Sequence, residues 1–321
     1  MGNVIVRKLK NGLNFCRKYG LRATLHEAFI DDYAIYSKLP PEKYEGALKR
    51  WYKRYTGEEL DLENPRTYCE KLQWLKLYDS TPLKTRLADK YLVREWVKEK
   101  IGEDYLIPLL GVWDDFDEID FDKLPDQFVL KATHGCKWNI VVRDKSKFVR
   151  QDARKKFKKW LHTNYAFAGG FEMQYKNMRP RVIAEAYVQT RNDDLHDYKV
   201  MCFAGRAEGI VFMSDRETKM KLILYDFVQN SREYAYSHFL EDVETLSMEQ
   251  LERIIQLAEC LSEGFPHVRV DFYALDDGSV KFGEMTFSSA SGLRYLDWIT
   301  VEQDCIFGDL IHLPAQKSPI P

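Results

Sequence analysis

Two short segments near the C-terminus carry residue types that could act on a phosphate. Arg269 and Asp271 fall on one face of a predicted β-strand, because they lie two positions apart. Glu284 and Thr286 share one face of a second predicted strand in the same way. The Asp276-Asp277-Gly278 turn between them predicts a hairpin. A hairpin registered about this turn could bring the two carboxylates, the guanidinium and the hydroxyl together.

Two carboxylates held this close raise each other's pKa unless a cation lies between them. Mg²⁺ prefers oxygen ligands and is commonly bound together with nucleotide phosphates. The pattern therefore suggests a magnesium site at Asp271 and Glu284, with Arg269 in contact with a phosphate. The alternative is an ordinary amphipathic hairpin whose polar face is solvated.

The composition is that of a globular protein of one large or two moderate domains. The chain has 321 residues, of which 45% are hydrophobic and 14% aromatic. Its net charge of −2 provides no basic field, so no nucleic-acid partner is expected. The sequence contains no run of 18 apolar residues and no apolar leader, which argues against a spanning helix and a secretory signal. Its six cysteines form no CxxC pair, so we expect reduced thiols in a cytoplasmic protein.

The first thirty residues are locally basic, with apolar positions in a loosely helical period. Such a segment can lie on an anionic membrane face as an amphipathic helix. More often it packs on its own domain while its lysines stay solvated. Peripheral contact with the inner face of the membrane through this segment is therefore left open.

Apolar periodicity and turn signals indicate a helical N-terminal region, residues 1–80, followed by an α+β domain, residues 81–321. Helices are predicted at 84–100, 155–162 and 247–261. Strands are predicted at 106–112, 127–133, 138–142, 181–188, 198–203, 207–213 and 222–228, and in the hairpin at 266–287. These short strands indicate a largely antiparallel sheet.

An acidic loop from Asp114 to Asp122 contains two Asp-x-Asp triplets. Sugar-nucleotide transferases use such triplets to hold a metal, so a glycosyltransferase is one function to consider. The alternation of acids with Phe favours a solvated connection anchored by its aromatic side chains.

Four features follow one another in a fixed order along the chain. Lys90 lies on the predicted helix, Lys131 ends an apolar strand, Glu185 lies in a later strand, and the hairpin comes last. In this order the chain resembles the ATP-grasp superfamily, and within it the TupA-like proteins of the teichuronopeptide biosynthesis type. The segments similar to that branch are 64–77, 128–135 and 282–287, and the resemblance covers roughly residues 60–313.

The resemblance implies an α+β fold whose two lobes clamp ATP between antiparallel sheets. The small nucleotide lobe would span about residues 126–188, and the metal and substrate lobe about residues 189–313. The implied chemistry is phosphorylation of a carboxylate by Mg²⁺-bound ATP, followed by attack of an amine on the acylphosphate.

The resemblance also implies nucleotide contacts. Lys90 and Lys131 would reach the phosphates, and an unpaired Lys131 would be costly to bury. Glu185 would contact the nucleotide, followed by main-chain contacts from Ala186 and Val188. The alternatives are a helix-surface role for Lys90 and an ion-paired strand carboxylate for Glu185. Further nucleotide contacts are implied for His134, Lys137 and Lys199.

Metal binding maps onto Asp271 and Glu284, with Thr286 at a position where the wider family often has Asn. A hydroxyl ligates Mg²⁺ more weakly, so the second metal contact is in question. Arg269 and Lys131 are the implied catalytic residues, since charge stabilisation dominates phosphoryl transfer. The phosphate loop 134–139 has a single glycine where the family has several, which argues for weaker closure or for a non-catalytic, ATP-binding scaffold.

The segment after Glu284 is rich in small residues, which would let a substrate approach closely. Its predicted substrate contacts, which could hold a carboxylate, are Ser288, Ser291, Gly292 and Arg294. A turn without a ligand is the alternative. The substrates implied by the resemblance are a uronic-acid-containing precursor of a cell-surface or capsule polysaccharide and an amine or amino acid.

Overall fold

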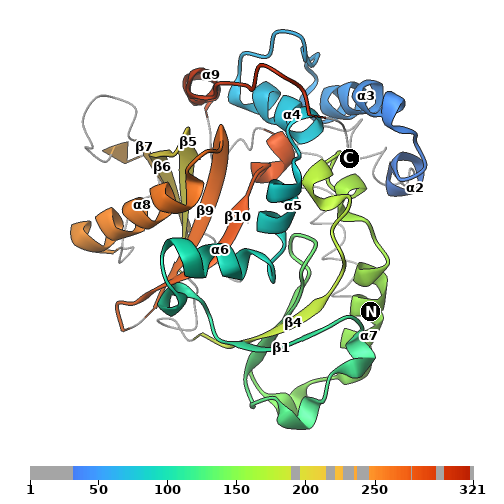
Figure 1. The fold of residues 1–321 in the computed structure, drawn as a ribbon, viewed down its shortest axis with the longest axis vertical. Coiled ribbons are helices and arrows are strands. Elements are labelled where there is room, and N and C mark those ends of the chain that lie inside the picture. Colours follow the sequence, from blue (N-terminus) through green and yellow to red (C-terminus); the bar gives the residue numbers. More distant parts are fainter. Residues whose placement is uncertain are drawn as a thin grey trace, which may run out of the picture.

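The computed structural model describes residues 32–188, 196–214, 221–226, 235–236, 246–275, 277–293 and 300–318. The basic segment 1–31 and Arg294 lie outside the described residues. Two antiparallel sheets form the framework of the described chain (Figure 1). Their strand orders are β1-β4-β2-β3 and β10-β9-β5-β6-β7-β8. The fold is the α+β architecture that the sequence predicts.

The four-stranded sheet has one face packed on a helix and one face left for other contacts. Its strands are β1 (Leu109–Trp113), β2 (Phe128–Ala132), β3 (Asn139–Val142) and β4 (Val182–Ala186). In β2, Phe128 and Leu130 are fully buried and join a core with Phe157 of α7 (Arg150–Leu161). Strand alternation therefore turns Val129 and Lys131 to the opposite face.

The second sheet is the larger of the two. Its strands are β5 (His196–Phe203), β6 (Arg206–Ser214), β7 (Lys221–Asp226), β8 (Ala235–Tyr236), β9 (His267–Ala274) and β10 (Val280–Thr286). Helix α8 (Met248–Ser262) lies along it (Figure 1) and begins at Ser247 with a capping box to Gln250. Val268, Val270 and Phe272 of β9 are buried in the same core as α8, so the other face of β9 carries the polar residues.

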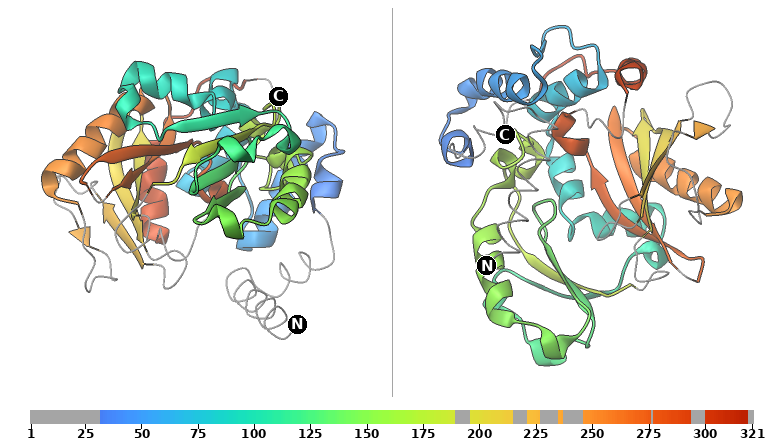
Figure 2. Two further views of the ribbon diagram at one scale, coloured as in Figure 1. Left: turned by 90° about the horizontal axis from the view of Figure 1, so that it is seen from below. Right: turned by 180° about the vertical axis from the view of Figure 1, so that it is seen from behind.

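The remaining helices surround the two sheets, as the views in Figure 2 show. They are α2 (Asp32–Tyr36), α3 (Tyr44–Thr56), α4 (Tyr68–Tyr78), α5 (Pro82–Ala88), α6 (Val93–Lys100) and α9 (Val301–Leu310). Short 3₁₀ turns are η1 (Pro41–Lys43), η2 (Glu103–Tyr105), η3 (Phe116–Glu118), η4 (Phe121–Lys123), η5 (Lys145–Lys147), η6 (Tyr165–Phe167), η7 (Met173–Tyr175) and η9 (Ser289–Gly292). The N-terminus of α4 is fixed by the Thr67–Glu70 capping box and by Asp304, whose Oδ1 accepts the Cys69 amide at 2.9 Å.

The continuous helix predicted over residues 84–100 is wrong. The chain forms two helices, α5 and α6, and Lys90 lies in the turn between them. The side chain of Asp89 accepts the amides of Tyr91 and Leu92 at 2.8 and 3.0 Å, so it satisfies N–H groups at the start of α6. Asp residues compete with helix hydrogen bonds in this way, and an otherwise helical pattern hid the break.

The acidic loop after β1 is a surface connection. Phe116 and Phe121 are buried, and they anchor the loop as the sequence suggests. The carboxylate of Asp117 accepts hydrogen bonds from Nε and Nη2 of Arg154 at 2.5 and 2.6 Å. It also forms an ion pair with Lys158 at 3.0 Å. The carboxylate that the triplets would offer to a metal is thus engaged with helix α7.

Within the described ranges, no helix is both long enough and apolar enough to cross a membrane.

Two helical glycines should respond oppositely to substitution by alanine. A Cβ on Gly308 would lie 2.3 Å from the Arg66 carbonyl oxygen and 2.8 Å from the Tyr68 nitrogen, so we expect Gly308→Ala to lower the free energy of unfolding by about 1–3 kcal/mol. A Cβ on Gly46 would meet only the flexible end of Arg50, so Gly46→Ala should raise it by about 0.5–1 kcal/mol. Urea unfolding of both variants checks this, and equal effects would contradict the packing of α9 on α4.

Candidate active site

A β-bulge at Gly283 determines which residues of β10 face the site. Phe282 pairs with Phe272, but the next pair is Glu284 with Asp271, so Gly283 is an extra residue. Regular pairing would place Glu284 opposite Val270 and turn its carboxylate to the core face. The bulge instead brings Glu284 and Asp271 to the same face.

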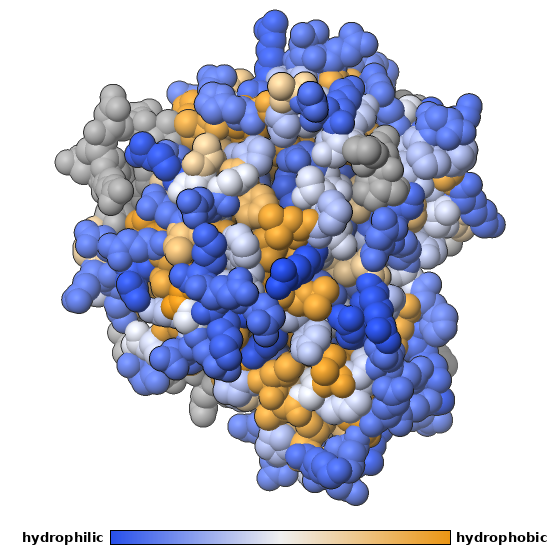
Figure 3. Space-filling model, viewed as in Figure 1, coloured by the Kyte–Doolittle hydropathy of each residue, from blue (hydrophilic) through white to orange (hydrophobic). Residues whose placement is uncertain are grey.

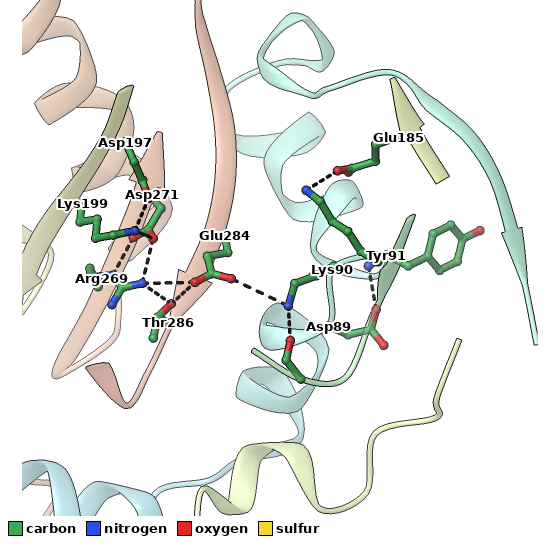
Figure 4. A network of polar contacts seen from close by, with 12 residues as sticks. Asp89, Lys90, Tyr91, Glu185, Asp197, Lys199, Arg269, Asp271, Glu284 and Thr286 are labelled. Atoms are coloured by element: carbon green, nitrogen blue, oxygen red, sulfur yellow. Dashed lines mark hydrogen bonds and ion pairs between the residues drawn. The ribbon is translucent and has the colours of Figure 1, made fainter. Parts of the chain in front are cut away.

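The guanidinium of Arg269 lies among the polar groups of this face (Figure 4). Its Nε and Nη2 donate to the two carboxylate oxygens of Asp271 at 2.7 and 2.8 Å. Nη2 also lies 3.2 Å from Glu284 Oε1 and 3.2 Å from Thr286 Oγ1. The four residues predicted from the hairpin are therefore brought together. The cation between the two carboxylates is a side chain of the same hairpin.

Lys199 in β5 adds a second cation. Its Nζ donates to Asp197 Oδ2 at 2.6 Å and to Asp271 Oδ2 at 2.5 Å. Burial alone would raise the pKa of Asp271, but Arg269 and Lys199 outweigh burial and hold that pKa below its ordinary value. The predicted nucleotide contact Lys199 is thus engaged with two carboxylates.

Glu284 is the more accessible of the two predicted acidic ligands. Its side chain is 29% exposed, whereas that of Asp271 is 2% exposed. Burial would raise the pKa of Glu284, and Lys90 and Arg269 bring it below its ordinary value despite Asp271. The carboxylate of Glu284 is therefore ionised near neutral pH.

The residues on this face fit a magnesium ion. Asp271 and Glu284 face the same side and, with the hydroxyl of Thr286, offer hard oxygen donors. Mg²⁺ usually takes one or two protein carboxylates and completes its shell with water and phosphate oxygens. Glu284 Oε2 has Lys90 at 3.8 Å, while both oxygens of Asp271 already receive hydrogen bonds from Arg269. The carboxylate of Glu284 is accordingly more available to Mg²⁺ than that of Asp271.

Lys90 connects the two sheets. Its Nζ donates to the Gly135 carbonyl at 2.6 Å. The same Nζ lies 3.8 Å from Glu284 Oε2, a contact that Figure 4 shows. Its backbone amide donates to the Thr133 carbonyl at 3.2 Å. Although Lys90 is not on a helix, its turn places the ammonium between the loop after β2 and the acidic residues of β10.

Lys131 and Glu185 lie together on the open face of the four-stranded sheet. Lys131 Nζ is 2.6 Å from Glu185 Oε2, and Arg94 Nη1 of α6 is 3.2 Å from Glu185 Oε1. The strand carboxylate is thus ion-paired, which was the alternative interpretation. Figure 3 shows apolar side chains over the lower part of the molecule, where Figure 1 places this sheet. An apolar surface next to paired charges is suited to a nucleotide base.

The other predicted nucleotide residues are less directly placed. His134 is buried, its Nε2 lies 3.0 Å from the Trp160 carbonyl, and burial lowers its pKa to about 4. Lys137 is exposed in a left-handed conformation with φ of 60°. The amide of Ala186 donates to the Pro108 carbonyl at 2.9 Å, and Val188 lies beyond the end of β4. Of these residues, Lys137 and Val188 have the most freedom to meet a ligand.

The predicted substrate segment forms the turn η9 directly after β10. Ser289 Oγ lies 3.5 Å from Arg269 Nη1, so the turn adjoins the acidic cluster. Ser288 and Ser291 both donate to the carboxylate of Glu172, and Gly292 has a φ of 68°. The predicted contact Arg294 lies outside the described residues.

Sequence reasoning missed several charged groups of the site. Asp197 was identifiable, since it lies two positions before Lys199 on one strand face. Arg94 lies four residues after Lys90, but the intervening break removes the helical relation between them. Glu172 carried no local signal, because it reaches the site only through the packing of distant segments.

The family assignment follows from this geometry together with the sequence. The family profile described as TupA-like ATPgrasp matches residues 70–312. This chain belongs to that family. The ATP-grasp fold expected from the resemblance is thereby confirmed. The sequence matches none of the curated proteins.

The chain has a distant likeness to several solved structures. N5-carboxyaminoimidazole synthetase from Staphylococcus aureus has 13% identity and a TM-score of 0.37, over 62% of this chain and 44% of that one. D-alanine–D-alanine ligase from Bacillus anthracis has 17% identity and a TM-score of 0.35, over 63% and 56%. The ATP-grasp ligase PsnB, with minimal precursor, Mg and ADP, has 11% identity and a TM-score of 0.40, over 76% and 65%. The chain thus spans about half the length of the first two.

Removing the guanidinium should destabilise the protein in a pH-dependent way. We expect Arg269→Met to lower the free energy of unfolding by about 3–5 kcal/mol at pH 7, because it leaves buried Asp271 short of a partner. The pKa of Asp271 is depressed in the folded state, so this stabilisation is present above its unfolded pKa of about 3.9 and is lost as pH falls. In Arg269→Met, burial raises the pKa of Asp271 without its main opponent, so the acid should take up a proton as the pH falls. The stability deficit of the variant should therefore narrow between pH 7 and pH 4.

Urea unfolding at pH 7, 5 and 4 measures this difference. The exposed Arg253, which bonds Tyr105, provides the matched control, and Arg253→Met should change stability by less than about 0.5 kcal/mol. A deficit for Arg269→Met that is the same at all three pH values would rule out the pairing with Asp271 as its cause.

Proposed function

We propose that this protein is an ADP-forming carboxylate–amine ligase that works through an acylphosphate. One observation carries the proposal: Arg269 is bonded to both Asp271 and Glu284, and Lys90 faces Glu284 from the turn between α5 and α6. This arrangement places two cations around one accessible carboxylate. Such a set suits the transfer of a phosphoryl group, in which positioning and charge stabilisation are the main tasks.

The nucleotide would bind between the sheets. Lys90 and Lys131 would contact its phosphates, and the exposed Lys137 would supply charge where the loop lacks glycine amides. The apolar face of the four-stranded sheet would take the base, with Glu185 and the main chain near Val188 at its edge. The ion pair with Glu185 holds the ammonium of Lys131 on this face.

Phosphoryl transfer is the first step of the proposed reaction. An oxygen of the substrate carboxylate attacks the γ-phosphorus, the bond to the β-γ bridging oxygen breaks, and ADP leaves. Arg269 would stabilise the charge on the transferring group, and Asp271 fixes its guanidinium through two parallel hydrogen bonds. Glu284 and Asp271, with Thr286, would hold Mg²⁺. When bound, this ion would neutralise phosphate charge and orient the leaving group.

Amide formation is the second step. The amine nitrogen attacks the acyl carbon, the carbon–oxygen bond to phosphate breaks, and phosphate leaves with the proton lost by the amine. The turn η9 would hold the substrates, because it adjoins Arg269 through Ser289. A uronic acid of a polysaccharide precursor is the proposed carboxylate and an amine or amino acid is the proposed nucleophile. Both assignments rest on the family resemblance.

The surface contacts of the Asp-x-Asp loop disfavour a glycosyltransferase. Asp117 is held by Arg154 and Lys158, and Asp115 accepts the Asp117 amide at 2.8 Å within its own turn. A metal would have to displace these contacts. A scaffold that binds ATP without turnover is the remaining alternative, and the reaction itself distinguishes it.

Release of ADP should depend on Glu284 and not on the acidic loop. With Mg²⁺-bound ATP, pooled uronic-acid nucleotide sugars and pooled amines, we expect ADP and phosphate to form in equal amounts. Glu284→Gln should lower the rate at least about 100-fold, because it removes a charged ligand close to the phosphates. Asp117→Asn is the control and should keep the wild-type rate, since Asp117 bonds only surface groups.

Product identity and binding decide among the alternatives. AMP in place of ADP would contradict the acylphosphate route, and a loss of activity in Asp117→Asn alone would favour a glycosyltransferase. Tight ATP binding without turnover of any pool would indicate a scaffold. Absence of ATP binding would overturn the proposal for the nucleotide site.

A further inference from the structure

A buried carboxylate lies behind the turn that follows β10. Glu172 is 4% exposed, and its two oxygens accept hydrogen bonds from the hydroxyls of Ser288 and Ser291, the latter at 2.8 Å. In the described ranges, no lysine or arginine lies within ion-pair distance of this carboxylate. Two hydroxyl hydrogen bonds are a modest set of partners for a buried charge.

The backbone around Glu172 is held in conformations that side chains rarely adopt. Ala290 and Ser291 have φ of 55° and 56°, and Phe171 has φ of 64°. These are three of the five non-glycine residues with positive φ in the described chain, so the strain is concentrated at this place. A Cβ on Gly169 would lie 2.2 Å from Glu172 Oε1, which shows how closely the segments approach. Concentrated backbone strain is typical of functional sites.

Helix α4 fixes the turn from the other side, and η9 lies beside it in Figures 1 and 2. Gln73 Nε2 donates to the Gly292 carbonyl at 2.6 Å, and Lys76 Nζ donates to the Ser291 carbonyl at 2.9 Å. Lys76 also donates to Gln73 Oε1 at 2.7 Å and lies 4.6 Å from the centre of the Trp51 ring. Lys76 is thus buried against two oxygen acceptors and an aromatic ring, so it is not presented to a substrate carboxylate.

The hydroxyl of Ser291 therefore has a defined direction. An ionised carboxylate only accepts hydrogen bonds, so Ser291 must donate its single proton to Glu172. Among the described residues no donor reaches Ser291 Oγ, which keeps its lone pairs for a ligand. Ser288 Oγ differs, because it already accepts from Gln174 Nε2 at 2.6 Å. The group that Ser291 can bind is a hydrogen-bond donor.

We propose that Ser291 Oγ holds the attacking amine of the ligase reaction, and that Glu172 is a positioning residue that keeps the serine oxygen free to accept an N–H. The inference rests on the proposed function and specifies its nucleophile site. It assigns an amine to this serine, where the sequence alone suggested a substrate carboxylate.

The place of the turn fits this role. Ser289 contacts Arg269, so the amine would lie beside the group that stabilises the phosphoryl transfer. One N–H donated to Ser291 leaves the nitrogen lone pair for the acyl carbon. The carbon–oxygen bond of the acylphosphate then breaks, and the departing phosphate carries away the second amine proton.

Hydroxylamine separates the two half-reactions, because it traps an acylphosphate as a hydroxamate without needing an amine site. The assay uses Mg²⁺-bound ATP, pooled uronic-acid nucleotide sugars and either hydroxylamine or pooled primary amines. We expect Ser291→Gly to keep hydroxamate formation within about twofold of wild type and to raise the KM for the amines about tenfold, as for one lost hydrogen bond. Glu172→Gln should also raise the KM for the amines, because the glutamine amide can donate to Ser291 Oγ and occupy the oxygen that would accept the amine N–H.

Ala290→Gly is the matched control. It relieves the same left-handed strain one position earlier but removes no hydroxyl, so it should leave both assays unchanged. Glycine also suits the conformation at position 291, so that variant should fold. Loss of hydroxamate in Ser291→Gly, or equal effects of the two glycine variants, would overturn the inference alone. Absence of hydroxamate in the wild type would overturn the proposed function and the inference together.

Discussion

Arg269 lies between two carboxylates that would repel each other if they were left unpaired. Its bond to Asp271 is bidentate, and one of its nitrogens also reaches Glu284 and Thr286. Without this guanidinium, the two acids would raise each other's pKa and would lose part of their charge. The acidic face of β9 and β10, and with it the proposed phosphate chemistry, depends on this pairing.

That pairing depends in turn on one extra residue in β10. Phe282 and Met285 are both buried although they lie three positions apart, which a regular strand does not allow. Gly283 absorbs the difference, and a Cβ there would lie 3.1 Å from the Asp271 carbonyl oxygen. The bulge keeps the apolar residues in the core while Glu284 turns to the site. A local change of register thus satisfies both faces of the strand.

Local patterns were sufficient to predict the strands and the hairpin, since alternation and turn residues are readable over a few positions. The residues of the hairpin were therefore grouped correctly, and the spacing of Phe282 and Met285 was an available sign of the bulge. The break at Asp89 was missed because a side-chain hydrogen bond to the backbone overrides helical periodicity. Glu172 and Lys76 were missed for a different reason. They meet at Ser291 from segments more than 90 residues apart, and no short-range pattern records such packing.

The proposed metal-binding residues on β10 come directly before the proposed substrate residues on η9, because the strand runs straight into the turn. Glu284 and Thr286 are on the strand, where the sheet fixes their positions, and Ser289 and Ser291 come within the next five residues. The two proposed steps act on one carboxyl group: its oxygen is phosphorylated, and its carbon is then attacked by the amine without leaving the site. A single rigid segment can hold both the phosphate and the amine at a fixed distance from this group. The left-handed turn, held by α4 and Glu172, makes the segment rigid past the end of the sheet.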